Sequence, residues 1–285
     1  KDVIEYANKR YVTIIPEIDI PGHTSSMIAA YPELGSSKEN IGVKTLWGVQ
    51  NDILNINETT FEFLENMFSE IVDLFPSKYI HIGGDEARKI QWKNSKIIQN
   101  QMKELDLKDE NELQSYFIKR IENFLNSKGK KIIGWDEIID GGLAPNATVM
   151  SWRGEEGAIH AAKSGHDAIM TPTSHCYFDY YQDKPNNEPL AIGGLLPLKK
   201  VYLYEPIPQG LSNEESKKIL GAQGNLWTEY IKKPKDVEYM IIPRMTALSE
   251  VVWSPRKLRN LGEFKKRLKS FKFFYDKLNV NYRKK

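Results

Sequence analysis

Six short apolar runs recur along the chain, separated by helical or loop sequence, and nearly all of them end in polar or aromatic residues. Near-continuous apolar runs of this length are typical of parallel strands that are buried on both faces. Their alternation with helices predicts an α/β fold. The runs cover residues 12–19, 79–86, 131–137, 148–152, 168–171 and 221–229.

Helical periodicity marks further stretches of the chain. Apolar residues recur at three- and four-residue spacing over 61–75 and over 113–125, which predicts two amphipathic helices. Another helix is expected at about residues 261–278. The segment at about 172–220 is rich in proline and tyrosine, and we expect it to be an elaborated loop over the active-site face.

The ends of the runs favour one α/β architecture over another. A (β/α)8 TIM barrel builds its active site from residues at the carboxyl ends of several strands, whereas a doubly wound sheet concentrates its ligands near one switch point. The pattern therefore predicts a TIM barrel, as a single partial domain over residues 1–285. Because six runs are two short of eight, we expect this chain to lack the first two strands.

Composition excludes several classes of protein. The 285 residues include 40 basic and 38 acidic side chains, so the formal net charge is +2 and nucleic-acid binding is not indicated. Cys176 is the only cysteine, which excludes a disulfide scaffold. No run approaches the roughly 18 apolar residues of a membrane span, so we expect none.

The most distinctive motif is the segment 81–86, His-Ile-Gly-Gly-Asp-Glu. Adjacent residues on a strand point to opposite faces, so Asp85 and Glu86 can share a substrate only where the backbone bends. Gly83 and Gly84 permit that bend. Glu86 is a candidate general acid, because a carboxyl group next to another carboxylate and near tryptophans should hold its proton longer than a free one. Such an acid could protonate a leaving oxygen, as glycoside cleavage requires. The alternative is that both are solvated carboxylates at the end of a strand.

Two other interpretations of the acidic residues remain open. Asp85 is also placed to cap a helix beginning near Ala87. Asp19 and His23, with Asp85 and Glu86, offer a mixed carboxylate and imidazole set for a divalent ion. We favour no metal, because no second histidine stands at helical spacing from His23.

Three tryptophans end three different runs and are expected to line a pocket for the apolar face of a sugar. Taken singly, each would more often belong to a core. The three are Trp135, Trp152 and Trp227, whereas Trp47, Trp92 and Trp253 lack that placement and are expected to be structural.

At this point the segment 81–86 resembles the signature of the β-N-acetylhexosaminidases of glycoside hydrolase family twenty. Further segments resemble those of the family in the same order, so that the resemblance covers nearly the whole chain. They lie at residues 16–23, 134–137, 151–152, 177–179, 221–229 and 244–253.

The resemblance implies an exo-acting, retaining enzyme that needs no cofactor and removes terminal β-linked N-acetylglucosamine or N-acetylgalactosamine. In the family the nucleophile is the 2-acetamido oxygen of the substrate, which forms an oxazolinium-like intermediate. By resemblance, Glu86 is the acid and then the base. Asp85 orients the acetamide N–H, and Tyr177 donates its hydroxyl to the acetamide oxygen.

The remaining family roles concern the rest of the sugar. Asp179 and Glu229 resemble carboxylates that bind the outer hydroxyls, although each could instead form a loop ion pair. His23 and Asp19 are expected to support Glu86. The adjacent Asp136 and Glu137 read as positioning residues.

Two family residues have no counterpart here: the sugar-binding arginine of the first strand and the aspartate of the second. We expect both to come from a longer parent protein, since residues 3–7 read as the end of a helix. A non-catalytic carbohydrate-binding remnant and a metal-dependent hydrolase remain alternatives. The substrate class favours an exported protein.

Overall fold

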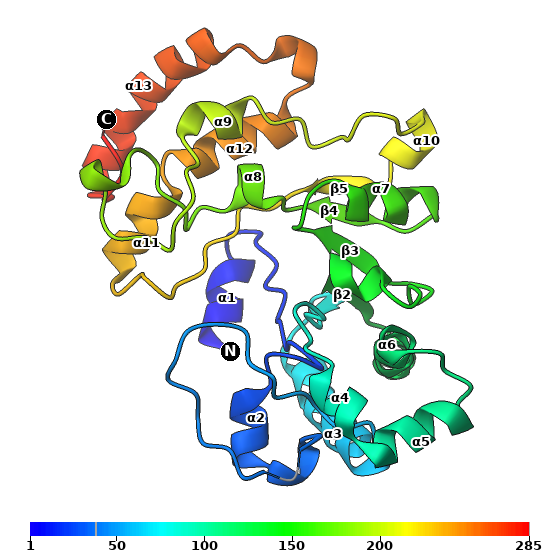
Figure 1. Ribbon diagram of the computed structural model, residues 1–285. Coiled ribbons are helices and arrows are strands. Elements are labelled where there is room, and N and C mark those ends of the chain that lie inside the picture. The colour runs from blue at the N-terminus through cyan, green and yellow to red at the C-terminus, as the bar shows by residue number, and fades with distance from the viewer. Residues whose placement is uncertain (38, 285) are drawn as a thin grey trace. The chain divides into compact units, whose positions relative to one another are not determined.

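The structure is a computed structural model that describes residues 1–37 and 39–284 (Figure 1). The chain forms two compact units, Lys1–Met150 and Ser151–Lys285. Strands within each unit run parallel, and helices lie between them in sequence, as expected of an α/β protein.

Three parallel strands organise the first unit: β1 (Tyr79–His81), β2 (Lys131–Trp135) and β3 (Thr148–Ser151), whose last residue begins the second unit. Tyr79 pairs with Lys131 and Ile133 with Thr148. Most residues of these strands are buried, which explains their near-continuous apolar sequence. The strands predicted over 79–86, 131–137 and 148–152 are confirmed, with earlier ends.

The strand predicted over residues 12–19 is wrong. The segment follows β1 in parallel through a single bridge between Glu17 and His81. Its hydrogen bonds run from His81 N–H to Pro16 O at 2.9 Å and from Ile18 N–H to His81 O at 3.0 Å. Val12 and Ile15 at its start are exposed, and Pro16 has no N–H to donate, so regular pairing does not develop.

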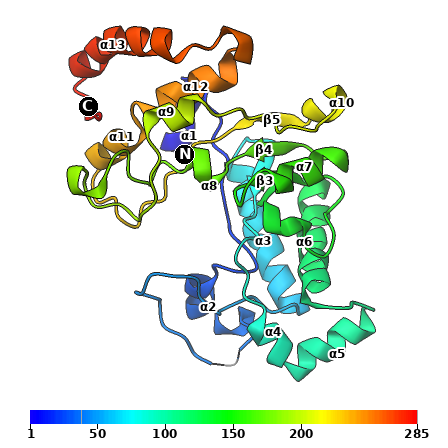
Figure 2. The ribbon, with the colours of Figure 1, turned by 45° about the horizontal axis from the view of Figure 1, so that its top comes forward.

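Two long helices of the first unit pack against each other (Figure 2). They are α3 (Glu58–Leu74) and α6 (Glu110–Ser127), and they confirm both predicted amphipathic helices. The side chains of Asn57 and Asp109 cap their first turns by accepting backbone N–H groups. The rings of Phe61 and Phe117 meet between them, with centroids 5.1 Å apart.

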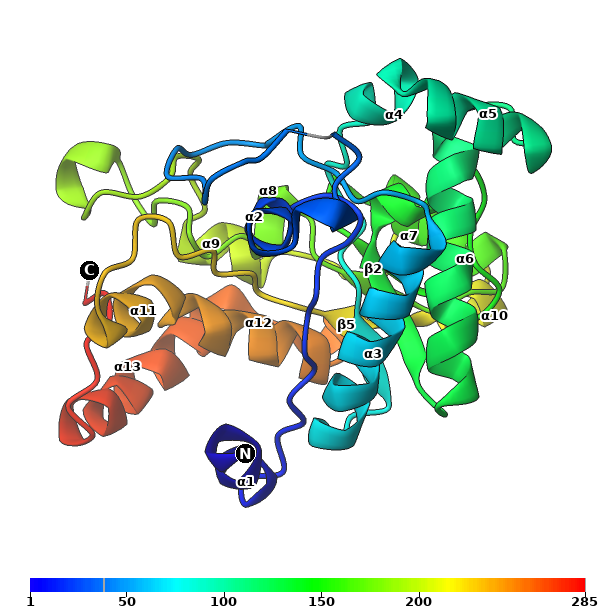
Figure 3. The ribbon, with the colours of Figure 1, turned by 90° about the horizontal axis from the view of Figure 1, so that it is seen from below.

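Shorter helices complete the first unit, which Figure 3 shows from below. They are α1 (Asp2–Asn8), α2 (Ser25–Ala30), η1 (Pro32–Leu34), α4 (Ile90–Asn94), α5 (Lys96–Glu104) and η2 (Asp136–Ile139).

The second unit contains the parallel pair β4 (Ala168–Met170) and β5 (Ile219–Ala222). The last predicted run, 221–229, is therefore strand only at its start, and β5 begins two residues before it. Beyond Ala222 the pairing is limited to a bridge between Asn225 and Tyr177. Gly224 passes so close to Phe178 that a Cβ there would lie 2.4 Å from its ring.

The helices of the second unit are short between Pro172 and Leu220 and longer near the end of the chain. The short ones are α8 (Thr173–Cys176), η3 (Pro185–Asn187), α9 (Leu198–Tyr202) and α10 (Asn213–Ser216), and before them α7 (Glu156–Lys163) lies between β3 and β4. They are followed by α11 (Pro234–Ile241), α12 (Arg244–Trp253), η4 (Arg256–Leu258) and α13 (Leu261–Lys277). Among the described residues, no helix is both long and apolar enough to cross a membrane.

The interface of α3 and α6 should dominate the stability of the first unit. Phe117 is fully buried, so Phe117→Ala leaves a cavity and should lower the free energy of unfolding by about 3–5 kcal/mol. The same change at Phe273, which is 66% exposed, should alter it by less than about 0.5 kcal/mol. Urea denaturation of both variants measures the difference, and equal losses would contradict this assignment of the core.

Candidate active site

The turn after β1 requires both of its glycines. Gly83 and Gly84 have φ of +67° and +94°, in the region that other residues rarely adopt. A Cβ on Gly83 would lie 1.8 Å from Oδ1 of Asp19, and Gly84 donates its N–H to that same oxygen at 3.0 Å. The predicted bend is confirmed, and it exists because the backbone passes directly against Asp19.

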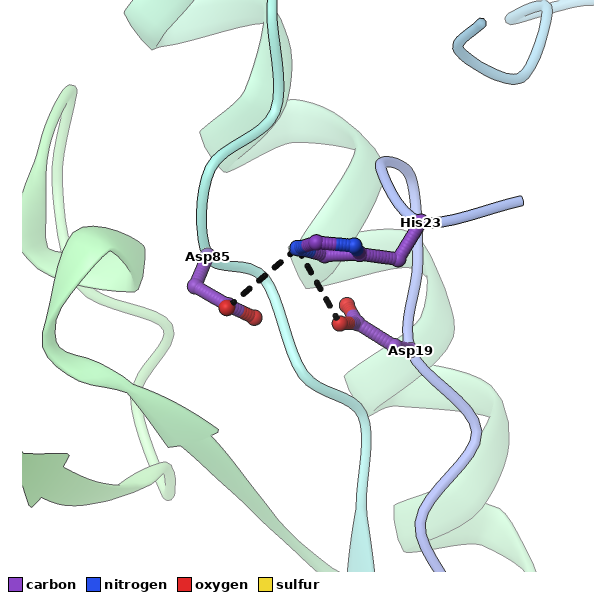
Figure 4. A group of neighbouring side chains, drawn as sticks. All are labelled: Asp19, His23 and Asp85. Carbon is purple, nitrogen blue, oxygen red and sulfur yellow. Dashed lines mark ion pairs between the residues drawn. The ribbon is translucent and has the colours of Figure 1, made fainter. Parts of the chain in front are cut away.

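The bend brings two adjacent carboxylates to one imidazole. Nε2 of His23 lies 3.5 Å from Oδ2 of Asp85 and 3.4 Å from Oε2 of Glu86. It also lies 4.0 Å from Oδ2 of Asp19 (Figure 4). The carboxylates of Asp85 and Glu86 therefore approach the same atom, although adjacent residues of a regular strand would point to opposite faces.

Two residues of this cluster have a strained backbone conformation. Glu86 and His23 have φ of +50° and +53°, a left-handed conformation that costs free energy for residues other than glycine. These two residues are the ones that face each other at 3.4 Å. Strain of this kind persists only where surrounding contacts enforce it, and it is common at active sites.

The charges of the cluster are strongly coupled. Burial, and then the charge of Asp85, raise the pKa of Asp19 far above its usual range, so Asp19 holds its proton at neutral pH. The hydrogen bond to Asp85 is the main cause that raises the pKa of His23, and the charges of Asp85 and Glu86 add to it. Burial opposes this rise.

The same cluster also contains candidate metal ligands. Among the described residues, Asp19, His23 and Asp85 each offer one ligand atom within 4.8 Å of the others, a donor set that suits a divalent ion. However, Asp19 already accepts the Gly84 N–H, and Asp85 already pairs with His23.

Trp135, the last residue of β2, is held by Glu17 of the segment 12–19. Its indole N–H donates to Oε1 of Glu17 at 2.9 Å, and its ring lies 4.8 Å from that of His81. Nδ1 of His81 is 3.2 Å from the same Glu17 oxygen. The sequence alone assigned no role to Glu17 or His81; their place in the two motifs was the only available signal.

The second unit gathers another set of expected site residues. The ring of Tyr177 is buried and lies 6.4 Å from Trp152 and 5.6 Å from Tyr180. Asp179 is buried too, and burial raises its pKa to about 6. The charge of Glu229 contributes to this rise, which indicates that the two predicted sugar-binding carboxylates lie in one neighbourhood.

Trp227 lies on the irregular segment after β5 and is 39% exposed. That segment is fixed to the neighbourhood of Tyr177 by backbone hydrogen bonds. Asn225 N–H donates to Cys176 O at 2.7 Å, and Phe178 N–H donates to Asn225 O at 2.6 Å.

Three other expectations have clear outcomes. Asp85 does not cap a helix, since α4 begins at Ile90 with Lys89 at its N-cap. Trp92 is structural as predicted, because it is fully buried and its indole N–H donates to Leu54 O at 2.8 Å. Trp47 and Trp253 are 71% and 89% exposed, so neither belongs to the core of the described residues.

Comparison with known proteins extends these observations. Residues 1–256 match the model of the glycosyl hydrolase family 20 catalytic domain. The chain is 45% identical to a β-hexosaminidase of Porphyromonas gingivalis over 99% of its own length and 37% of that protein. It is 37% identical to a β-hexosaminidase of Vibrio furnissii, over 87% of the chain and 42% of that protein.

Solved structures agree. The exo-β-N-acetylglucosaminidase of Vibrio harveyi in complex with N-acetylglucosamine superposes with a TM-score of 0.88 at 34% identity, over 99% of this chain and 45% of that one. The chitobiase of Flavobacterium johnsoniae gives 0.86 at 32% identity, over 98% and 41%. The chain thus spans less than half of these relatives, and by its sequence and its fold it belongs to glycosyl hydrolase family 20.

Proposed function

We propose that this chain contributes the catalytic residues of a retaining exo-β-N-acetylhexosaminidase, which removes terminal β-linked N-acetylglucosamine or N-acetylgalactosamine from glycans or chitin-type oligosaccharides. The observation that carries the proposal is the convergence of Asp85 and Glu86 on Nε2 of His23, at a strained Gly-Gly turn in a family 20 chain. The names of its relatives support the same substrate class. The activity belongs to the whole protein that carries the chain.

In the proposed reaction Glu86 protonates the leaving oxygen while the carbonyl oxygen of the substrate's acetamide attacks the anomeric carbon. Asp85 accepts the acetamide N–H and balances the positive charge of the oxazolinium-like intermediate. Glu86, now ionised, then removes a proton from the water that opens this intermediate. The sugar leaves with retained configuration, and Glu86 regains its proton.

The other residues hold the sugar in the reactive position. Tyr177 donates its hydroxyl to the acetamide oxygen, which fixes the attacking atom. Asp179 and Glu229 accept hydrogen bonds from the outer hydroxyls, and their electrostatic coupling supports a shared role. Trp135, Trp152 and Trp227 contact the acetamide methyl group and the apolar face of the ring.

His23 and Asp19 support the two catalytic carboxylates. Nε2 of His23 lies within 3.5 Å of both carboxylates, and the hydrogen bond to Asp85, followed by the charges of Asp85 and Glu86, raises the pKa of His23. Protonated Asp19 adds no further negative charge and anchors the turn through Gly84. Their effect on the substrate is exerted through Asp85 and Glu86.

We propose that residues 1–285 are part of one (β/α)8 barrel whose remaining strands, and the sugar-binding arginine, lie outside them. Five parallel strands in the described residues, family membership and coverage of less than half of several relatives support this arrangement. The activity is therefore best tested on the longer protein that carries the chain.

The reaction is tested with chromogenic N-acetyl-β-glucosaminide and the matching β-glucoside. Only the first should release its aglycone, because the β-glucoside has no acetamide nucleophile. Glu86→Gln should lower kcat about 10²–10⁴-fold, since the amide cannot donate the proton. Release should be unchanged by a chelator.

Each alternative gives a different result in this assay. Loss of release with a chelator would favour a metal-dependent hydrolase. Binding of N-acetylglucosamine without release would favour a carbohydrate-binding remnant.

Asp85 has a separate role that Asp85→Asn should reveal. The amide keeps the size of the side chain but loses its negative charge, so kcat should fall about 10²–10³-fold with a smaller change in KM. Asp73→Asn, on the exposed face of α3, is the matched control and should leave both constants unchanged. Steady-state kinetics decide, and a change in KM alone would exclude this role.

The His23 ion pairs predict a pH-dependent stability. Because the folded pKa of His23 is raised above the unfolded value of about 6.5, its stabilisation is full below that value and is lost as pH rises through the folded pKa. His23→Asn, which tolerates a positive φ, should therefore lower the melting temperature more at pH 5 than at pH 9. Scanning calorimetry across this range measures the difference.

His160→Gln removes a histidine from the exposed surface of α7 and controls for general effects of losing an imidazole. A deficit in the His23 variant that is constant with pH would show that the ion pairs do not stabilise the fold.

A further inference from the structure

Arg244, the first residue of α12, is fully buried. Burying a guanidinium costs free energy unless its donors are satisfied. Within residues 1–37 and 39–284, every hydrogen bond of its side chain goes to a backbone carbonyl, and none goes to a carboxylate. This pattern differs from that of a charge-paired core arginine and indicates that Arg244 organises the main chain.

Its bonds fix the backbone on both sides of a proposed substrate-binding residue. Nη2 donates to Phe178 O at 2.5 Å, and Nη1 donates to Tyr180 O at 3.0 Å. These carbonyls flank Asp179, and Tyr177 directly precedes them. Nη1 also donates to Leu196 O at 3.0 Å. This bond holds a later segment of the loop between β4 and β5.

Arg244 also binds the C-terminal end of α11. Nε and Nη2 of Arg244 donate to Met240 O at 3.1 and 2.6 Å, which satisfies a carbonyl of the last helical turn. Nearby, the side-chain amide of Gln182 donates to Tyr239 O at 2.7 Å. The loop is thus tied to α11 and α12 at two points, one of which is the guanidinium.

Close packing leaves the loop little room to move elsewhere. A Cβ on Gly224 would lie 2.4 Å from the Phe178 ring, and one on Gly194 would lie 2.2 Å from the Tyr180 ring. The guanidinium of Arg244 itself lies over the Phe178 ring, 5.2 Å from its centroid. The backbone of residues 178–180 is therefore held by packing on its side chains and by Arg244 on its carbonyls.

We propose that Arg244 is a positioning residue, which fixes the backbone of residues 178–180 so that Tyr177 and Asp179 keep the orientation needed to hold the substrate. This inference rests on the proposed function. Arg244 touches neither the sugar nor the reacting atoms, and it acts through the segment that it holds.

The chemistry of the side chain explains why an arginine stands here. A planar guanidinium presents five N–H donors in a rigid fork, enough for the four carbonyls of Phe178, Tyr180, Leu196 and Met240. A lysine has three donors on one nitrogen and cannot serve four separated acceptors. Burial lowers the pKa of Arg244 to about 9, while the nearby charges of Asp179 and Glu188 oppose this, so it remains charged at neutral pH.

The test compares Arg244→Lys with wild type in the protein that carries this chain. Hydrogen exchange of the amides of residues 178–182 should rise at least 10-fold in the variant, while those of α13 stay protected. With chromogenic N-acetyl-β-glucosaminide, kcat/KM should fall about 10²-fold, the cost of misplacing a substrate by about 1 Å. Both kcat and KM should change, because Tyr177 and Asp179 are displaced together.

Two further variants separate positioning from general stability. Arg267→Lys, at an exposed arginine that pairs with Glu250 of α12, should leave exchange of 178–182 and kcat/KM unchanged. Arg244→Ala should regain part of its kcat/KM in low millimolar guanidinium, which can occupy the vacated site. Glu86→Gln should gain nothing from guanidinium.

The proposal is overturned if a folded Arg244→Lys keeps wild-type exchange at 178–182, or if kcat/KM stays within twofold despite faster exchange. Absence of rescue in a folded Arg244→Ala also counts against it. If wild type itself releases no aglycone from the N-acetyl substrate, the proposed function fails. The exchange data then still decide whether Arg244 fixes the segment.

Discussion

The turn that carries Asp85 and Glu86 depends on the close approach of the Asp19 carboxyl group to the backbone of Gly83 and Gly84. Gly84 donates its N–H to Asp19 at 3.0 Å across 65 residues of sequence, and any side chain on Gly83 would collide with the same carboxyl. This contact joins the segment that carries His23 to the turn that carries the two acidic residues. The strained conformations of His23 and Glu86 persist because it holds both backbones in place.

The same approach brings three carboxyl groups close to one imidazole, which raises the pKa values of Asp19 and His23. Three carboxyl groups around one imidazole would repel one another if all were ionised. Burial and the charge of Asp85 keep Asp19 protonated, and the hydrogen bond to Asp85, with the charges of Asp85 and Glu86, raises the pKa of His23.

In the second unit, hydrogen bonds to irregular backbone fix the positions of Tyr177 and Asp179. Tyr177 and Asp179 lie on irregular backbone, whose polar groups must find partners outside a helix or strand. Asn225 supplies backbone partners from one side, and the buried guanidinium of Arg244 supplies side-chain donors from the other. The backbone of a loop that is held in this way can be as well defined as that of a strand.

Periodicity and motif composition, read along the sequence, determined the α/β class, the helices α3 and α6 and the Gly-Gly bend before Asp85. These are local properties: side-chain spacing and the allowed φ of glycine are set within a few residues. The lack of regular pairing over residues 12–19, the early end of β5, and the partnerships of Glu17 with Trp135 and of Arg244 with four carbonyls were decided only by the tertiary structure. Each depends on burial or on contact between segments distant in sequence, and no local pattern encodes which donor will meet which acceptor.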